Sequence, residues 1–174
     1  MARLGLVRSF QISAIFPHLT VRENIRIALQ RLTGLSFAFW RNDTVLAPLN
    51  DRIERLAASF ELSRYLDTAA AELSYGLKRA LELATTLALD PEVLLLDEPT
   101  AGLAQDDIER VTALIKEAAA SRTVVMVEHN LSVVARLSDR ITVLTRGRVL
   151  AEGAYAEVSR NPAVLEAYIG TSDA

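Results

Sequence analysis

The chain has 174 residues, of which 51% are hydrophobic and 24% are charged, a composition that suits a globular domain with a buried core and excludes a disordered segment. The formal net charge of −3 argues against a nucleic-acid partner held by bulk positive charge. There is no cysteine and there are only two histidines, which excludes disulfides, cysteine-based zinc sites and a histidine-rich metal site.

No apolar run approaches the ~18 residues that a membrane span requires. A secretory signal also needs an uninterrupted apolar run, and Arg3 and Arg8 interrupt the N-terminal one. The sequence therefore predicts a soluble, cytoplasmic chain that reaches a membrane only through a partner.

Helical periodicity dominates the first half of the chain. Thr20 and Glu23 have the spacing of a capping box, in which each side chain accepts a hydrogen bond from the backbone amide of the other residue. A helix is therefore expected from residue 21, followed by amphipathic helices over about 53–60 and from Ser74 onward. The predicted inward positions of these helices are Val21, Ile25, Ala28, Leu29, Leu32, Ile53, Leu56, Ala57, Phe60, Ala80, Leu81, Ala84 and Leu87.

From residue 93 onward, short apolar runs alternate with helical patterns. Residues 93–96 and 123–127 are predicted as strands buried between helices, because both runs are apolar on both faces, as in a parallel sheet. The helix between them has Asp106 and Asp107 in its first turn, where the helix dipole favours negative charge. This order of strands and helices predicts a doubly wound α/β fold.

The C-terminal part is predicted to hold a short helix ending near Ser138 and a hairpin that turns at Arg146-Gly147. The last helix is expected to have Asn161 as its N-cap, Pro162 at its first position and Gly170 just past its end.

Polar residues that are costly to bury follow both predicted strands. They are Asp97-Glu98 and Glu128-His129. In α/β sheets, ligands bind beyond the carboxyl ends of the strands. A rigid strand can hold Asp97 where it orients Mg²⁺ on a nucleotide, while Glu98 faces the attacking water as a base. Taken alone, the acidic pair is equally typical of a strand that runs into a solvated loop.

Three further features carry little or no signal when each is taken alone. Ser74-Tyr75-Gly76 opens a helix whose exposed amides can bind an anion, although an ordinary N-capped helix has the same pattern. A lone His129 is more typical of a surface residue, and Gln11 has no signal of its own.

In their order and spacing, these pieces resemble the nucleotide-binding subunit of an ABC transporter over essentially the whole chain. The matching positions are Gln11 (Q-loop), Ser74, Tyr75 and Gly76 (signature motif), Asp97 and Glu98 (Walker B), Ala101, Gly102 and Leu103 (D-loop) and His129 (switch histidine).

The resemblance implies a partial P-loop NTPase fold, RecA-like, with ATP and Mg²⁺ as cofactors. Glu98 and His129 would be catalytic, Asp97 and Gln11 would hold the metal, and the signature residues would contact a nucleotide bound by a second ATP-binding subunit, identical or not. The implied divisions are 1–14 with the Q-loop, a helical subdomain over 15–78, and the remaining core over 79–174.

The resemblance also implies permease partners, which would hold the chain on the inner face of the cell membrane. Residues 8–11, 16–24 and 161–170 are similar to the branched-chain amino acid uptake group, whose transporters also work with a solute-binding protein. The resemblance thus implies uptake of branched-chain or other amino acids. Related importers of urea or short amides, and lipopolysaccharide exporters, share parts of this pattern and remain alternatives.

The phosphate-binding pattern Gly-x-x-x-x-Gly-Lys-Ser/Thr is absent, because Lys78 and Lys116 follow Leu77 and Ile115 rather than glycine. Leu77 and Ala104 also stand where the family usually has polar residues. We therefore expect an N-terminally truncated domain that exposes an apolar surface and binds ATP poorly. The alternative is a non-catalytic remnant that only docks on a permease or dimerises.

Overall fold

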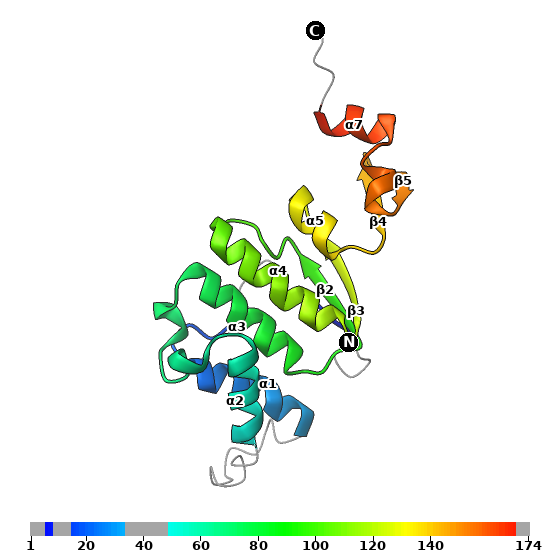
Figure 1. Cartoon of the computed structure of the whole chain (residues 1–174). Helices are drawn as coiled ribbons and strands as arrows, with labels where there is room; N and C mark the ends of the chain where they lie inside the picture. The colour runs from blue at the N-terminus through cyan, green and yellow to red at the C-terminus, as the bar shows by residue number, and fades with distance from the viewer. Residues whose placement is uncertain (1–5, 9–14, 34–48, 170–174) are drawn as a thin grey trace. The chain divides into compact units, whose positions relative to one another are not determined.

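The computed structural model describes residues 6–8, 15–33 and 49–169, which divide into two compact units (Figure 1). The first unit is Met1–Val127 and the second is Glu128–Ala174. Gln11 and Gly170 lie outside the described residues.

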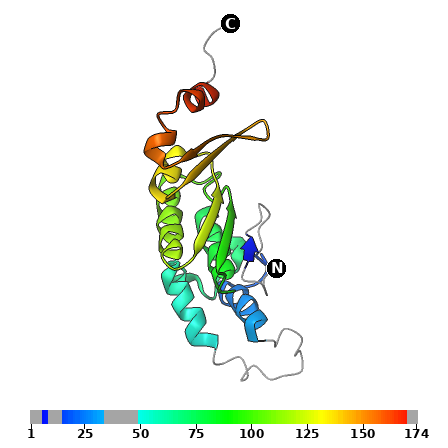
Figure 2. The same ribbon diagram turned by 90° about the vertical axis from the view of Figure 1, so that its right-hand side faces the viewer.

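The first unit is built on a sheet of three parallel strands in the order β1-β2-β3. In the sheet register, Leu94 lies between Val7 and Val124. Helix α3 packs against α1 on one side and α4 on the other (Figures 1 and 2). The elements in chain order are β1 (Leu6–Arg8), α1 (Val21–Thr33), α2 (Asn50–Ser59), η3 (Ser63–Tyr65), η4 (Ala70–Glu72), α3 (Tyr75–Leu87), β2 (Val93–Asp97), α4 (Gln105–Ala119) and β3 (Thr123–Val127).

Local sequence signals placed the helices of this unit correctly. The capping box before α1 is confirmed, since the Glu23 amide donates to Thr20 Oγ1 at 3.2 Å and the Thr20 amide donates to Glu23 Oε2 at 2.7 Å. Most of the predicted inward positions are buried, among them Val21, Ile25, Leu29, Ile53, Ala57, Phe60, Ala80, Leu81 and Ala84. The predicted α/β class is confirmed by the parallel sheet and its helices.

The predicted two-sided burial of residues 123–127 is wrong. Strand β3 is the last strand of the described sheet, and Val125 and Val127 on one of its faces are 52% and 62% exposed. In β2 only Leu94 and Leu96 are fully buried. One face of this part of the sheet is therefore covered, and the other exposes Val125 and Val127.

The second unit consists of α5 (Leu131–Leu137), β4 (Ile141–Thr145), β5 (Arg148–Gly153), α6 (Tyr155–Val158) and α7 (Pro162–Ile169). The predicted hairpin is confirmed, and it turns where Arg146 and Gly147 have φ values of 47° and 75°. Two consecutive residues with positive φ are typical of the type I′ turn, whose twist matches that of the strands. Asn161 caps α7 as expected, through a 3.0 Å hydrogen bond from the Ala163 amide. In the described parts of both units, no helix is long and apolar enough to cross a bilayer.

Candidate functional site

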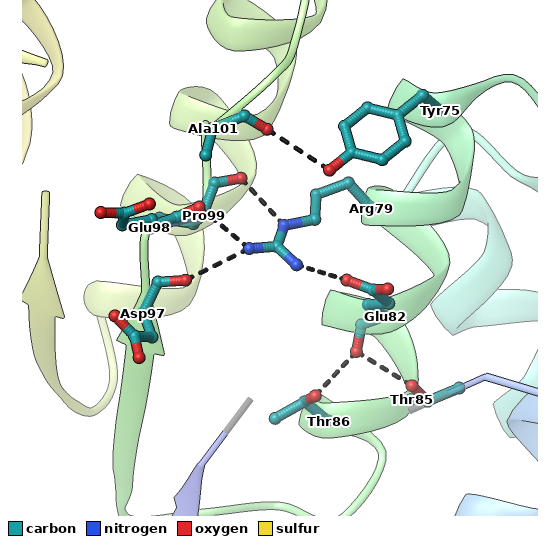
Figure 3. Close-up of polar contacts among 9 residues, drawn as sticks. All are labelled: Tyr75, Arg79, Glu82, Thr85, Thr86, Asp97, Glu98, Pro99 and Ala101. Atoms are coloured by element: carbon teal, nitrogen blue, oxygen red, sulfur yellow. Dashed lines mark hydrogen bonds and ion pairs between the residues drawn. The ribbon is translucent and has the colours of Figure 1, made fainter. Parts of the chain in front are cut away.

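The two acidic residues after β2 lie on a constrained backbone. Asp97 is the last residue of the strand, and Glu98 adopts a left-handed conformation with φ of 45°. The Glu98 amide donates to the Val127 carbonyl at 2.9 Å, and the Glu98 carbonyl accepts from the Ala101 amide at 3.1 Å. Both acidic residues are half-buried, and their carboxylates point away from Arg79 (Figure 3). The turn therefore directs two carboxylates outward from the end of the strand.

Arg79 on helix α3 binds the backbone of this turn from the other side. Its Nε donates to the Pro99 carbonyl at 2.9 Å, and its Nη2 donates to the carbonyls of Glu98 at 3.0 Å and Asp97 at 3.4 Å (Figure 3). Its Nη1 forms an ion pair with Glu82 at 2.6 Å, in which the two side chains are only 12% and 9% exposed. The guanidinium thus joins α3 to the end of β2.

The predicted signature residues open helix α3 and contact the predicted D-loop. Ser74 is the N-cap of the helix and accepts from the Leu77 amide at 3.4 Å. The Tyr75 hydroxyl donates to the Ala101 carbonyl at 3.4 Å (Figure 3). Gly102 has φ of 73°, and a Cβ built there would meet the Tyr75 ring at 3.6 Å. The structure thus brings together two motifs that are separate in the sequence. Leu103 lies in the same loop, one residue before the N-cap of α4.

Gly76 lies against the carboxylate of Asp107, at the start of α4, so closely that a side chain at position 76 would clash with it. Asp107 pairs with Arg110 at 2.9 Å, and Arg110 pairs with Glu61 at 3.1 Å. This chain of charges borders an open pocket of about 570 Å³. The pocket is lined by Glu61, Ser63, Arg64, Tyr65, Ser74, Leu77, Asp107 and Arg110.

His129 belongs to the second unit, where its side chain is 69% exposed. Its amide donates to Glu128 Oε2 at 3.0 Å, and its ring Nδ1 lies 3.8 Å from the same oxygen. The roles predicted for His129 in catalysis and for Gln11 on a metal stay predictions.

The donor set at the end of β2 fits Mg²⁺ bound together with a nucleotide. Among the described residues there is no cluster of three or more histidine or acidic side chains that would form a cage for a metal. Mg²⁺ in nucleotide sites does not need such a cage, because one or two carboxylates, phosphate oxygens and waters complete its octahedron. The hard oxygens of Asp97 meet that requirement.

Comparisons with known proteins show the family of the chain. Residues 2–101 match the sequence model of the family described as "ABC transporter". The chain belongs to this family. It is therefore, by family, an ABC-type ATPase that binds nucleotide. Residues 148–174 match a second model, described as "Branched-chain amino acid ATP-binding cassette transporter".

Two relatives of this ABC protein are branched-chain amino acid transport ATP-binding proteins. The chain is 35% identical to LivG of Salmonella typhimurium over 177 residues and 33% identical to BraF of Pseudomonas aeruginosa over 180 residues. Each alignment covers 98% of this chain and 69% of the relative. The ADP conformation of MJ1267, an ATP-binding cassette of an ABC transporter, matches with a TM-score of 0.77 and 25% identity, covering 97% of this chain and 70% of that one. The P-loop NTPase fold is thereby confirmed.

No sequence motif marked Arg79 and Glu82 as site residues. A signal was nevertheless present, because Glu82 is a charged residue within an otherwise apolar stretch of the helix. A buried charge requires a partner, and Arg79 stands three residues away, on the same face of the helix.

Proposed function

We propose that this chain is the ATP-binding and ATP-hydrolysing subunit of a transporter that takes up branched-chain amino acids. One observation supports this substrate class most directly: the match of residues 148–174 to the branched-chain cassette model, at the opposite end of the chain from the general ABC match. LivG and BraF, aligned over nearly the whole chain, carry the same substrate in their names.

The geometry supports a division of labour between the two acids. Asp97 would hold Mg²⁺, which supplies positive charge to the phosphates when it is bound. Glu98, one residue further on, would accept a hydrogen bond from the attacking water and take its proton at a carboxylate oxygen. The hydrogen bonds to the Glu98 backbone amide and carbonyl would keep that carboxylate in one direction.

The signature residues would act on a nucleotide held by a second ATP-binding subunit. Helix α3 has 13 residues, and its N-terminal amides at Tyr75 and Gly76 suit a phosphate oxygen. The loop of Ala101, Gly102 and Leu103 would couple that nucleotide to the two acids of its own chain, since Tyr75 contacts Ala101. Gln11 would add a metal ligand and His129 a hydrogen bond to the phosphate.

The proposal also covers the partners of the chain. Residues 15–78 would form the helical subdomain that contacts the permease subunits at the inner face of the membrane, between a first segment, 1–14, and a core segment, 79–174. A solute-binding protein would deliver the amino acid to the permease from the other side.

The test is to measure ATP hydrolysis and leucine uptake in vesicles that contain the chain and its permease subunits. Glu98→Gln keeps the size of the side chain but removes the base, so hydrolysis should fall by ~10²-fold or more. Glu109→Gln, on the exposed surface of α4, is the matched control and should retain wild-type rates. Equal rates in the Glu98→Gln variant and the wild type would refute the role of Glu98.

The same vesicles separate the alternatives. If urea rather than leucine stimulates hydrolysis by the wild type, the transported substrate is urea and not a branched-chain amino acid. A chain that binds the permease without hydrolysing ATP would be a docking module, in keeping with the absence of a Gly-x-x-x-x-Gly-Lys-Ser/Thr pattern from its 174 residues.

A further inference from the structure

The backbone at Glu98 has a conformation that non-glycine residues adopt only rarely. Its φ of 45° lies in the left-handed region, where Cβ crowds the carbonyl oxygen. Such residues persist when the surrounding structure holds them in place, and they concentrate at functional sites. The interactions that hold Glu98 therefore bear directly on the direction of its carboxylate.

Arg79 supplies three of the hydrogen bonds that hold this turn. Its donors reach the carbonyls of three successive residues, 97 to 99, at 3.4, 3.0 and 2.9 Å (Figure 3). Only a planar guanidinium offers enough donors in a fixed plane to bind successive carbonyls in this way. The turn is thus held from one side by the helix that also carries the signature residues.

Glu82 fixes the guanidinium in turn. Its carboxylate pairs with Nη1 of Arg79, and its own backbone carbonyl accepts from Thr85 Oγ1 at 2.9 Å and Thr86 Oγ1 at 2.7 Å. A charge pair alone would satisfy the electrostatics of Arg79 in a largely buried position. The remaining donors are aimed at the backbone of one turn, the one that contains Glu98.

We propose that Arg79 is a positioning residue for ATP hydrolysis: it holds the 97–99 turn so that the Glu98 carboxylate faces the attacking water. Glu82 keeps the guanidinium in place. The proposal rests on the proposed function of Glu98. Because Arg79 and Tyr75 both bind this loop from α3, the signature residues and the acids of one chain form a connected block.

The first test is kinetic, in the vesicles described above. Arg79→Gln should lower kcat for ATP hydrolysis by ~10-fold or more with KM for ATP little changed, because a small misplacement of a reacting group is costly. Arg79→Lys, which keeps the charge but can bind fewer carbonyls, should recover part of the loss. Arg140→Gln, on the exposed hairpin of the second unit, is the control and should leave both constants unchanged.

The second test needs no catalysis. In the isotope-labelled full chain, the Cα and carbonyl chemical shifts of Glu98 report its backbone conformation. Arg79→Gln should move these chemical shifts toward the values of residues with negative φ. The signals of Val133 and Val158 in the second unit should stay in place. Glu82→Gln keeps the volume of the side chain and should move the Glu98 shifts in the same direction by a smaller amount.

The two tests separate the proposal from the function on which it rests. Wild-type kcat and unmoved Glu98 shifts in Arg79→Gln would overturn the positioning role. If Arg79→Gln fails to fold, Glu82→Gln decides in the same way. If the wild type hydrolyses no ATP, the proposed function fails. A change in the Glu98 chemical shifts of Arg79→Gln would still show that Arg79 holds the turn.

Discussion

The two compact units use charged side chains in different ways. In the first unit, the Arg79–Glu82 pair is 12% and 9% exposed and shares its donors with backbone carbonyls. In the second unit, the Arg140–Glu152 pair is 73% and 44% exposed and lies across a hairpin. A shielded pair has a strong effect on local geometry, whereas water weakens an exposed pair to little or nothing.

The same contrast holds for apolar side chains. The first unit fully buries large residues such as Leu81, Leu94 and Ile115. In the described part of the second unit, the buried hydrophobic residues are three valines, and the hairpin pair Leu144 and Val149 is 68% and 61% exposed. A strained turn needs a rigid support, and the unit with the larger core is the one that contains the Glu98 turn.

The largest expected effect tests this difference in packing. Leu81→Ala removes a side chain with no exposed surface from α3 and should lower the free energy of unfolding by ~2–5 kcal/mol. Leu144→Ala removes the same atoms from a position that is 68% exposed, and it should change that free energy by less than ~0.5 kcal/mol. Urea titration followed by circular dichroism measures both. Similar losses in the two variants would show that Leu144 is as well packed as Leu81 and would remove the contrast.

Features that depend on a few neighbouring residues could be predicted from the sequence. The capping box of Thr20 and Glu23, the cap at Ser74 and the turn at Arg146-Gly147 are all set within four residues, so local chemistry decides them. The order of the motifs also indicated the family, because that order can be read from the sequence without a structure.

Features that depend on tertiary packing could not be predicted. Arg79 binds carbonyls that lie 18 to 20 residues further along the chain, and backbone carbonyls have no signature in a sequence. The apolar pattern of 123–127 indicated a strand that suits a covered sheet, but it did not reveal that Val125 and Val127 lie on an open face. The left-handed conformation of Glu98 follows from the turn and not from the residue type.

A smaller effect is expected where Gly76 meets Asp107. Gly76→Ala should lower the free energy of unfolding by ~1 kcal/mol, because the new methyl group displaces the Asp107 carboxylate and breaks its pair with Arg110. In an Asp107→Ala background the obstacle is gone, and Gly76→Ala should instead stabilise the helix by up to ~1 kcal/mol. The double-mutant cycle, measured by urea unfolding, gives the coupling. A loss of the same size in both backgrounds would mean that Asp107 is not the obstacle.

The smallest effect concerns the exposed pair of the second unit. Hydrogen bonds from Arg140 and Thr142, together with the positive charge of Arg140, hold the pKa of Glu152 below the ordinary glutamate value of 4.5. A lowered carboxyl pKa adds stability above the ordinary value, and this contribution is lost as the pH falls through the lowered one. Arg140→Gln should therefore raise the pKa of Glu152 toward 4.5, as measured by carbon NMR titration. Because water screens this exposed pair, the substitution should lower the urea midpoint at pH 7 only slightly.

The internal reference for this titration is Glu23 in the first unit. Its pKa is lowered chiefly by the hydrogen bond from the Thr20 amide, which Arg140 does not touch, so its titration should be identical in the two proteins. A large fall in the urea midpoint of Arg140→Gln at pH 7 would contradict the contrast between the units. It would show that an ion pair in water supports the hairpin as firmly as the buried Arg79–Glu82 pair supports the Glu98 turn.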